Sequence, residues 1–192
     1  MIHSSESLEA ELERLQHRPG ADSVPPVLCE FIVDVCDNPA HYANRLRSVL
    51  SAAVGLGVTS DFEEDILLVD DVPDWFIAIS SQDEERSPDF AKNGRNAFTD
   101  QTKQPPWELQ NWLYRFHPEE DSRGWEWWDI TPAGPSRVHV WVDSWGESFF
   151  GCEELRWASY TAGALRVEGP FVQQSSVWAE AAAEGTFDAS QS

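Results

Sequence analysis

Ten tryptophans in a chain with a formal net charge of −21 constrain its fold more than any other feature. The charge comes from 34 acidic residues against 13 basic ones. An acidic chain with few aromatic residues would be expected to stay disordered. Large indole rings, however, favour burial. We therefore expect a folded protein with a tryptophan-rich interior and an anionic exterior.

The chain length and cysteine content indicate one compact cytoplasmic domain. A chain of 192 residues can bury about 70% of its unfolded surface. Cys29, Cys36 and Cys152 are odd in number and form no CxxC pair, a pattern that suits a reducing compartment. The first residues resemble no secretory signal. No segment approaches the roughly 20 apolar residues that cross a bilayer, so we expect no membrane association.

The first half of the chain predicts a β-α-β-β order after an N-terminal helix. Residues 4–17 have leucines at helical spacing, and Val27–Val35 alternates as a strand. Asn38 and Pro39 predict the start of a helix that ends at Gly55 and Gly57. Residues 66–69 and 75–79 are apolar and flank Pro73, which indicates a β-hairpin.

The second half predicts a β-β-β-α-β order. Residues 81–106 are expected to form an irregular loop, with Asn93-Gly94 as a turn. The predicted elements that follow are strands at residues 112–116, 125–130 and 137–143, a helix at 152–162, a strand at 164–172 and a terminal helix at 176–184. As an alternative to the first strand, residues 107–113 could begin as a helical turn.

These patterns together predict an α+β fold in which helices pack on a mostly antiparallel sheet. We expect a single compact domain over residues 1–192. The alternative is two halves, 27–80 and 107–172, joined by the long loop 81–106. No residue-level repeat relates the halves.

Two acidic segments are the candidate partner-binding sites. The first gathers seven carboxylates within fourteen residues, and they are Asp61, Glu63, Glu64, Asp65, Asp70, Asp71 and Asp74. The second is Glu119, Glu120 and Asp121. Clustered carboxylates can ligate Mg²⁺ or Ca²⁺, but the ligand order of a calcium loop is absent. We therefore predict a solvated or partner-facing surface and no metal site.

The tryptophan-rich strands and two polar side chains offer further interpretations. We expect Trp125 and Trp127 to be core residues that share a strand face with Asp129, with Trp128 opposite. A partner surface and a sugar-stacking platform are the alternatives. His117 lies beside acids but in an apparent exposed turn. Cys152 at a helix start could be activated by His139, but the adjacent Glu153 and Glu154 disfavour a thiolate.

The function predicted from these features is a non-enzymatic acidic binding protein. It would neutralise a basic partner protein, as an inhibitor or immunity-type protein does against a toxin or nucleic-acid-processing enzyme. Scattered arginines argue against nucleic-acid binding. We predict no catalytic residues and no cofactor. The alternatives are a metal-dependent hydrolase that uses the same carboxylates with His117 or His139, and a structural subunit. The partner's identity and the oligomeric state stay open.

Overall fold

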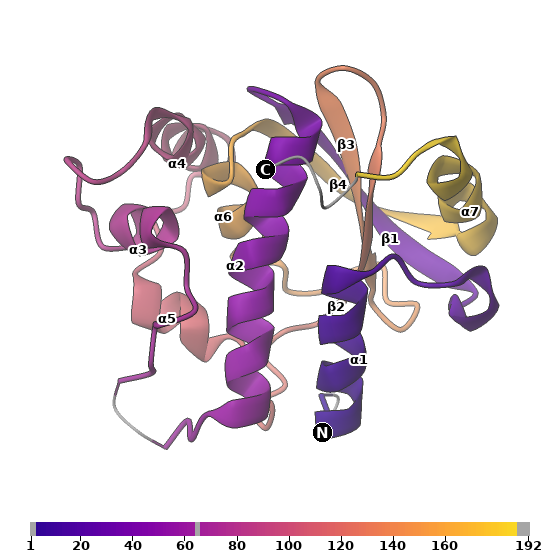
Figure 1. Ribbon diagram of the computed structural model, residues 1–192, viewed down its shortest axis with the longest axis horizontal. Helices are drawn as coiled ribbons and strands as arrows, with labels where there is room; N and C mark the ends of the chain where they lie inside the picture. The colour runs from indigo at the N-terminus through magenta and orange to yellow at the C-terminus, as the bar shows by residue number, and fades with distance from the viewer. Residues whose placement is uncertain (1–2, 64–65, 188–192) are drawn as a thin grey trace.

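The computed structural model describes residues 3–63 and 66–187, and its centre is a four-stranded antiparallel sheet (Figure 1). The strands are β1 (Val27–Val35), β2 (Glu126–Pro132), β3 (Arg137–Asp143) and β4 (Ala164–Gln174). Their order across the sheet is β2-β3-β1-β4, and each neighbouring pair is antiparallel. The predicted α+β class is confirmed, and the order of elements is roughly the predicted one. The first strand of the chain lies between two strands from the second half.

Helices cover both faces of this sheet unequally. The helices are α1 (Ser5–Gln16), α2 (Pro39–Thr59), α3 (Asp74–Ser80), α4 (Asp89–Thr102), α5 (Leu109–Tyr114), α6 (Glu153–Thr161) and α7 (Ser175–Glu184), with a 3₁₀ turn, η1 (Ala21–Ser23). Helices α2 to α6 lie on one side of the sheet, and α7 lies on the other (Figure 1). Helix α1 runs beside α2 at the β2 edge.

Local sequence explains α2, the longest helix. The Asn38 side chain accepts a hydrogen bond from the Ala40 N–H at 2.8 Å, and Pro39 occupies the first helical position. Leu46 and Leu50, four residues apart, are buried on its inner face. The prediction that glycines end this helix is wrong. The helix continues through both of them to Thr59, because the packed apolar face outweighs their low helix propensity.

The predicted hairpin over residues 66–79 is wrong. Residues 66–69 form an extended loop, and the second apolar run is helix α3. Pro73 is the residue before the helix, and Asp74 lies in its first turn, where the helix dipole favours a carboxylate. The buried residues of α3 are Ala78 together with Phe76, Ile79 and Ser80, of which the last two follow Phe76 by three and four residues. Their spacing fits one face of a helix, which a short apolar run does not distinguish from a strand.

The predicted loop at 81–106 and the predicted strand at 112–116 are also wrong. Helix α4 occupies much of the first segment. Gly94 lies inside it, and a Cβ there would be 1.8 Å from the Tyr160 carbonyl oxygen of α6. The glycine therefore permits close helix contact and does not mark a turn. Glu108 caps the start of α5, whose buried positions Leu109, Trp112 and Leu113 follow a helical period.

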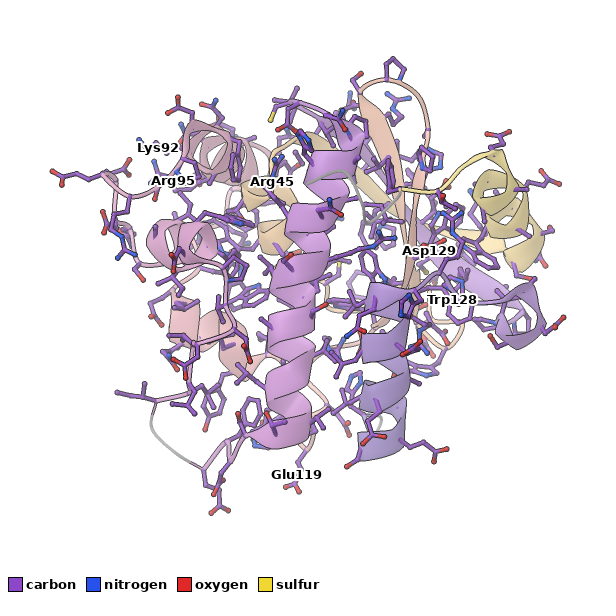
Figure 2. The ribbon with its side chains drawn as sticks, in the orientation of Figure 1. Arg45, Lys92, Arg95, Glu119, Trp128 and Asp129 are labelled. Atoms are coloured by element: carbon purple, nitrogen blue, oxygen red, sulfur yellow. The ribbon has the colours of Figure 1, made fainter. Side chains whose placement is uncertain are left out.

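The tryptophans fill two cores, one on each side of the sheet. The main cluster contains Trp112, Trp125, Trp127 and Trp157. The second cluster contains Leu28 with Trp128, Trp141 and Trp178, and α7 covers it. The interpretation of the indoles as core is confirmed for these seven rings. The second cluster lies on the α7 side, where Trp128 is labelled (Figure 2).

A β-bulge at Trp128 corrects one detail of the predicted strand. The pairing of β2 with β3 shifts between Trp127 and Asp129. The extra residue turns Asp129 away from the Trp127 face. The Asp129 carboxylate instead accepts hydrogen bonds from Trp178 Nε1 at 3.0 Å and from Arg18 Nε at 2.8 Å.

Side chains of α1 close the outer edge of β2. Glu11 Oε1 accepts from the Trp127 N–H at 2.6 Å, and Arg14 Nε donates to the Trp127 carbonyl at 2.8 Å. Arg18 donates to the Ile130 carbonyl at 3.3 Å. Glu11 also receives two hydrogen bonds from Arg123, at 2.6 and 2.8 Å, and both side chains are buried. These contacts satisfy backbone groups that an open sheet edge would expose.

We expect Glu11→Ala to lower the free energy of unfolding by about 3–5 kcal/mol, because it leaves the Arg123 guanidinium buried without its carboxylate. Urea unfolding measures the loss. The double variant Glu11→Ala/Arg123→Met should recover part of it, and Glu9→Ala on the exposed face of α1 should change stability by less than about 0.5 kcal/mol. Equal effects of the two single glutamate variants would contradict the assignment.

A pair of glycine substitutions tests the α4–α6 contact. Gly94→Ala should destabilise the protein by about 1–3 kcal/mol, because the new methyl group meets the Tyr160 backbone. Gly55→Ala in α2 meets nothing within 4 Å and should stabilise it by about 0.5–1 kcal/mol through helix propensity. Thermal unfolding should show a loss of stability for Gly94→Ala and a gain for Gly55→Ala. A change of the same sign in both variants would show that helix propensity alone determines their stability and would contradict the α4–α6 contact.

Candidate partner-binding surface

The structure brings part of both predicted acidic segments together at one end of the molecule. Asp61, Glu63 and Glu119 line a pocket of about 280 Å³ just beyond the C-terminus of α2. Glu119 lies at the end of the molecule opposite Arg45 and the α4 residues Lys92 and Arg95 (Figure 2). We name as the acidic end Asp61, Glu63 and Glu119 at this pocket, together with Ile66, Leu68 and Glu120, which are close to them in the chain.

Aromatic contacts hold the two acidic segments in place. Phe62 is buried between the carboxylates, and its ring centroid is 4.8 Å from that of His117 and 5.8 Å from that of Tyr114. The Tyr114 hydroxyl donates to the Phe62 carbonyl. His117 Nδ1 accepts a hydrogen bond from the Glu119 N–H at 3.1 Å. The histidine therefore fixes the turn that carries Glu119.

Two apolar side chains at the acidic end are exposed, which the sequence pattern did not predict. Ile66 is 71% exposed and Leu68 is 67% exposed, whereas Leu67 between them is buried. The Gln110 side chain binds both backbone groups of Leu67, accepting from its N–H at 2.9 Å and donating to its carbonyl at 3.1 Å. This clamp on α5 presents the neighbouring side chains to solvent.

The carboxylates of the acidic end pair with none of the basic side chains that the structure describes. Within residues 3–63 and 66–187, no ion pair involves Asp61, Glu63, Glu119 or Glu120. At the opposite end, by contrast, Arg45 binds Asp37 at 2.8 Å, and Arg95 binds Glu84.

The remaining predicted residues lie outside the pocket. Asp70, Asp71 and Asp74 are exposed at the turn before α3 and in its first turn, without ion pairs in the described part of the chain. Asp121 is exposed in the turn after Glu119. Glu64 and Asp65 fall outside the described residues. Residues of both segments thus line one pocket, and the other described carboxylates lie outside it.

Cys152 is not a nucleophile poised for activation. It is buried in the main core before α6, and burial raises the pKa of its thiol to about 11, with a further upward contribution from Glu154 and Glu153 that Arg156 partly offsets. His139 lies on the other face of β3, beside Trp141 of the second core. Cys152 is thus a buried core residue, and its raised pKa agrees with the expectation that Glu153 and Glu154 disfavour a thiolate.

Two other carboxylates owe their pKa values to interior contacts. Glu30 is buried beside His139, at 2.8 Å, and Gln173. Burial raises its pKa, but the hydrogen bonds from these partners outweigh that effect and leave the pKa below its usual range. Burial raises the pKa of Glu154, although Trp125 and Arg115 donate to it. These groups organise the fold on both faces of the sheet.

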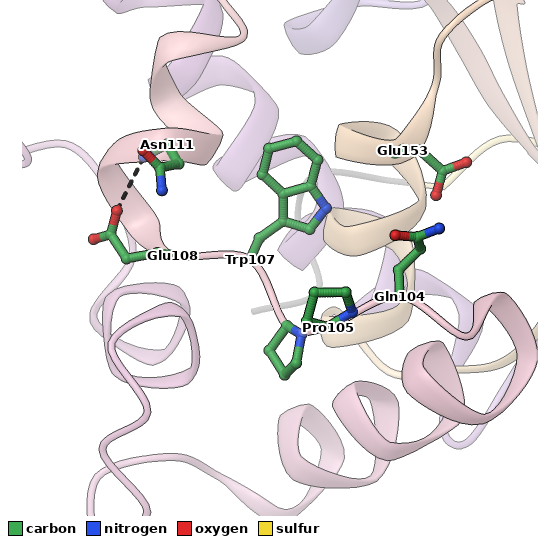
Figure 3. A pocket seen from close by; sticks show the side chains of 7 residues that line it. Gln104, Pro105, Trp107, Glu108, Asn111 and Glu153 are labelled. Atoms are coloured by element: carbon green, nitrogen blue, oxygen red, sulfur yellow. Dashed lines mark hydrogen bonds between the residues drawn. The ribbon is translucent and has the colours of Figure 1, made fainter.

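A second pocket, of about 310 Å³, lies between the residue 104–107 linker, α5 and α6 (Figure 3). Trp107, Glu108 and Glu153 line it. Both Glu108 oxygens accept backbone N–H groups of α5, at 3.2 and 3.1 Å. This carboxylate therefore serves as a helix cap. In the described ranges, no three His, Cys, Asp or Glu side chains converge as a metal site.

Comparisons with protein-family models, curated proteins and solved structures found no match to this chain. None of the helices within the described ranges combines the length and apolar character needed to cross a bilayer.

We expect Gln110→Ala to release the segment at Leu67. Hydrogen exchange at the Leu67 amide should accelerate about tenfold, because this amide loses its hydrogen-bond acceptor and the Leu67 carbonyl loses its donor. The loss of global stability should stay near 1 kcal/mol. Asn111→Ala, at an exposed neighbouring position, is the matched control. Unchanged exchange in Gln110→Ala would show that other contacts hold the segment.

Proposed function

We propose that this protein is a non-enzymatic inhibitor or immunity-type protein that binds a basic partner protein through the acidic end. The observation that carries the proposal is the combination of unneutralised carboxylates with two exposed apolar side chains. Asp61, Glu63 and Glu119 face a common pocket, and Ile66 and Leu68 lie exposed beside them in the chain. A surface of this kind matches a cationic cleft in charge and supplies apolar contact at its margin.

The two components have different physical roles in binding. Carboxylates on an anionic protein steer a basic partner over distances of about a Debye length and raise the association rate constant. The side chains of Ile66 and Leu68 act at contact distance, where their burial slows dissociation. The three free cysteines, two of them buried, support the cytoplasm as the place where the encounter occurs.

The test compares two variants of equal charge. The acidic-end variant is Asp61→Asn/Glu63→Gln/Glu119→Gln. The control is Asp100→Asn/Glu180→Gln/Glu184→Gln, which neutralises exposed carboxylates on α4 and α7. Partners captured from the source cell by wild-type protein are purified and their rate constants measured. The association rate constant at low salt should fall at least about tenfold for the acidic-end variant and change about twofold or less for the control.

Apolar variants separate the second component. Ile66→Ser/Leu68→Ser should increase the dissociation rate constant by about tenfold and leave the association rate constant nearly unchanged. Circular dichroism and thermal unfolding confirm that each variant is folded. The proposal fails if no captured protein is basic, or if the two charge variants slow association equally.

A further inference from the structure

A separate apolar pocket of about 390 Å³ opens where the entry to β1 meets the end of β3. Pro25 and Pro26 form one wall with Val27, and Asp143, Trp145 and Gly146 complete the lining. None of these residues belongs to the acidic end. The mixture of apolar walls with a carboxylate suggests a ligand that has an apolar stem and a cationic head.

The carboxylate of Asp143 is half-buried at this pocket. Its Oδ1 accepts a hydrogen bond from the Trp145 N–H at 2.8 Å. Within the described ranges it forms no ion pair. Burial raises its pKa and the nearby Glu126 raises it further, whereas the hydrogen bond from the Trp145 N–H and the charge of Arg14 lower it.

Glu126 adds electrostatic repulsion at Asp143, because the two residues are directly paired across β2 and β3. Like charges at such positions destabilise a sheet. The charge of Glu126 is matched by Arg14, whose Nη2 lies 3.0 Å from its Oε2. Arg14 also attracts the Asp143 carboxylate, but among the described residues only Glu126 of this pair forms an ion pair with Arg14. A cation bound in the pocket would form an ion pair with the Asp143 carboxylate.

Trp145 provides an aromatic surface beside this carboxylate. It is 45% exposed, the most exposed of the ten tryptophans. Its backbone is in the left-handed region, with φ of 54°, a conformation that costs a non-glycine residue energy. The ring meets the buried His3 edge-on, with 5.6 Å between centroids. Neighbouring groups thus hold the indole in a defined position at the pocket.

We propose that this pocket binds the arginine side chain of a partner protein. The guanidinium would stack on the Trp145 indole and donate hydrogen bonds to Asp143, while the methylene stem packs on Pro25 and Pro26. Arginine fits better than lysine because a planar guanidinium can stack and donate at once. The Asp143 carboxylate would repel an anionic ligand. An apolar ligand would displace the water that solvates this carboxylate without replacing the lost hydrogen bonds.

The test uses blocked single amino acids, so that it does not depend on the partner or on the acidic end. Acetyl-arginine methylamide is titrated into the full-length protein while the Trp145 indole N–H is followed by NMR, with Trp145→Phe used to assign the signal. The indole resonance should shift and saturate. Acetyl-citrulline methylamide, the neutral isostere, should bind at least about tenfold more weakly.

Two charge-neutralising variants complete the design. Asp143→Asn should weaken arginine binding about tenfold. Glu147→Gln, at an exposed position four residues further along the chain, removes the same charge and should change binding about twofold or less. Trp145→Leu, which lacks the π-system, should also weaken binding, which is followed in this variant through the backbone amide of Gly146 at the pocket. This variant provides a second test if Asp143→Asn folds poorly. Equal binding of arginine and citrulline, equal binding of arginine and acetyl-lysine methylamide, or equal losses in the two charge variants would each overturn the assignment.

Discussion

The buried pair of Glu11 and Arg123 is the interaction on which the rest of the structure depends. Helix α1 has a narrow apolar face, and its buried leucines alone would hold it weakly. The Glu11 carboxylate joins it to the sheet by accepting the Trp127 N–H and two guanidinium hydrogen bonds. Arg123 in turn lies over the rings of Phe116 and Trp125, about 5 Å from each. One ion pair therefore closes the edge of β2 and covers the main core.

The same arrangement explains how a chain with 34 acidic residues can enclose so many indoles. Several carboxylates are inside, and arginines accompany them: Glu126 is paired with Arg14, Asp129 with Arg18, and Glu154 with Arg115. Since the chain has 13 basic residues, each arginine used in the interior is one fewer to balance the surface. The exterior is consequently more anionic at particular places than the composition suggests, and the acidic end is such a place.

The sequence predicted elements well where local pattern and tertiary environment agree. Val27–Val35 and Arg137–Asp143 have the expected bounds, because strict alternation fits a strand with distinct faces. The pattern failed where one signal has two physical causes. Apolar residues at 75–79 suit a strand or a short helix, and packing of Phe76 and Ile79 decided for α3. Gly94 reads as a turn residue, yet what requires it is the Tyr160 backbone of a helix more than 60 residues away.

Recognition sites are harder still to predict, because they depend on what tertiary structure leaves uncompensated. The sequence identified Asp61 and Glu119 as acidic, but their shared pocket depends on contacts of Phe62 with Tyr114 and His117. The sequence pattern did not predict a binding role for Asp143, since one aspartate at a strand end is ordinary. Its character arises because Arg14, which also attracts Asp143, is ion-paired with Glu126 across the strand pair, so that Asp143 has no ion pair among the described residues. The arginines that stabilise the fold by pairing with buried carboxylates are thus not available to pair with carboxylates on the surface. Those surface carboxylates can bind cationic groups of other molecules.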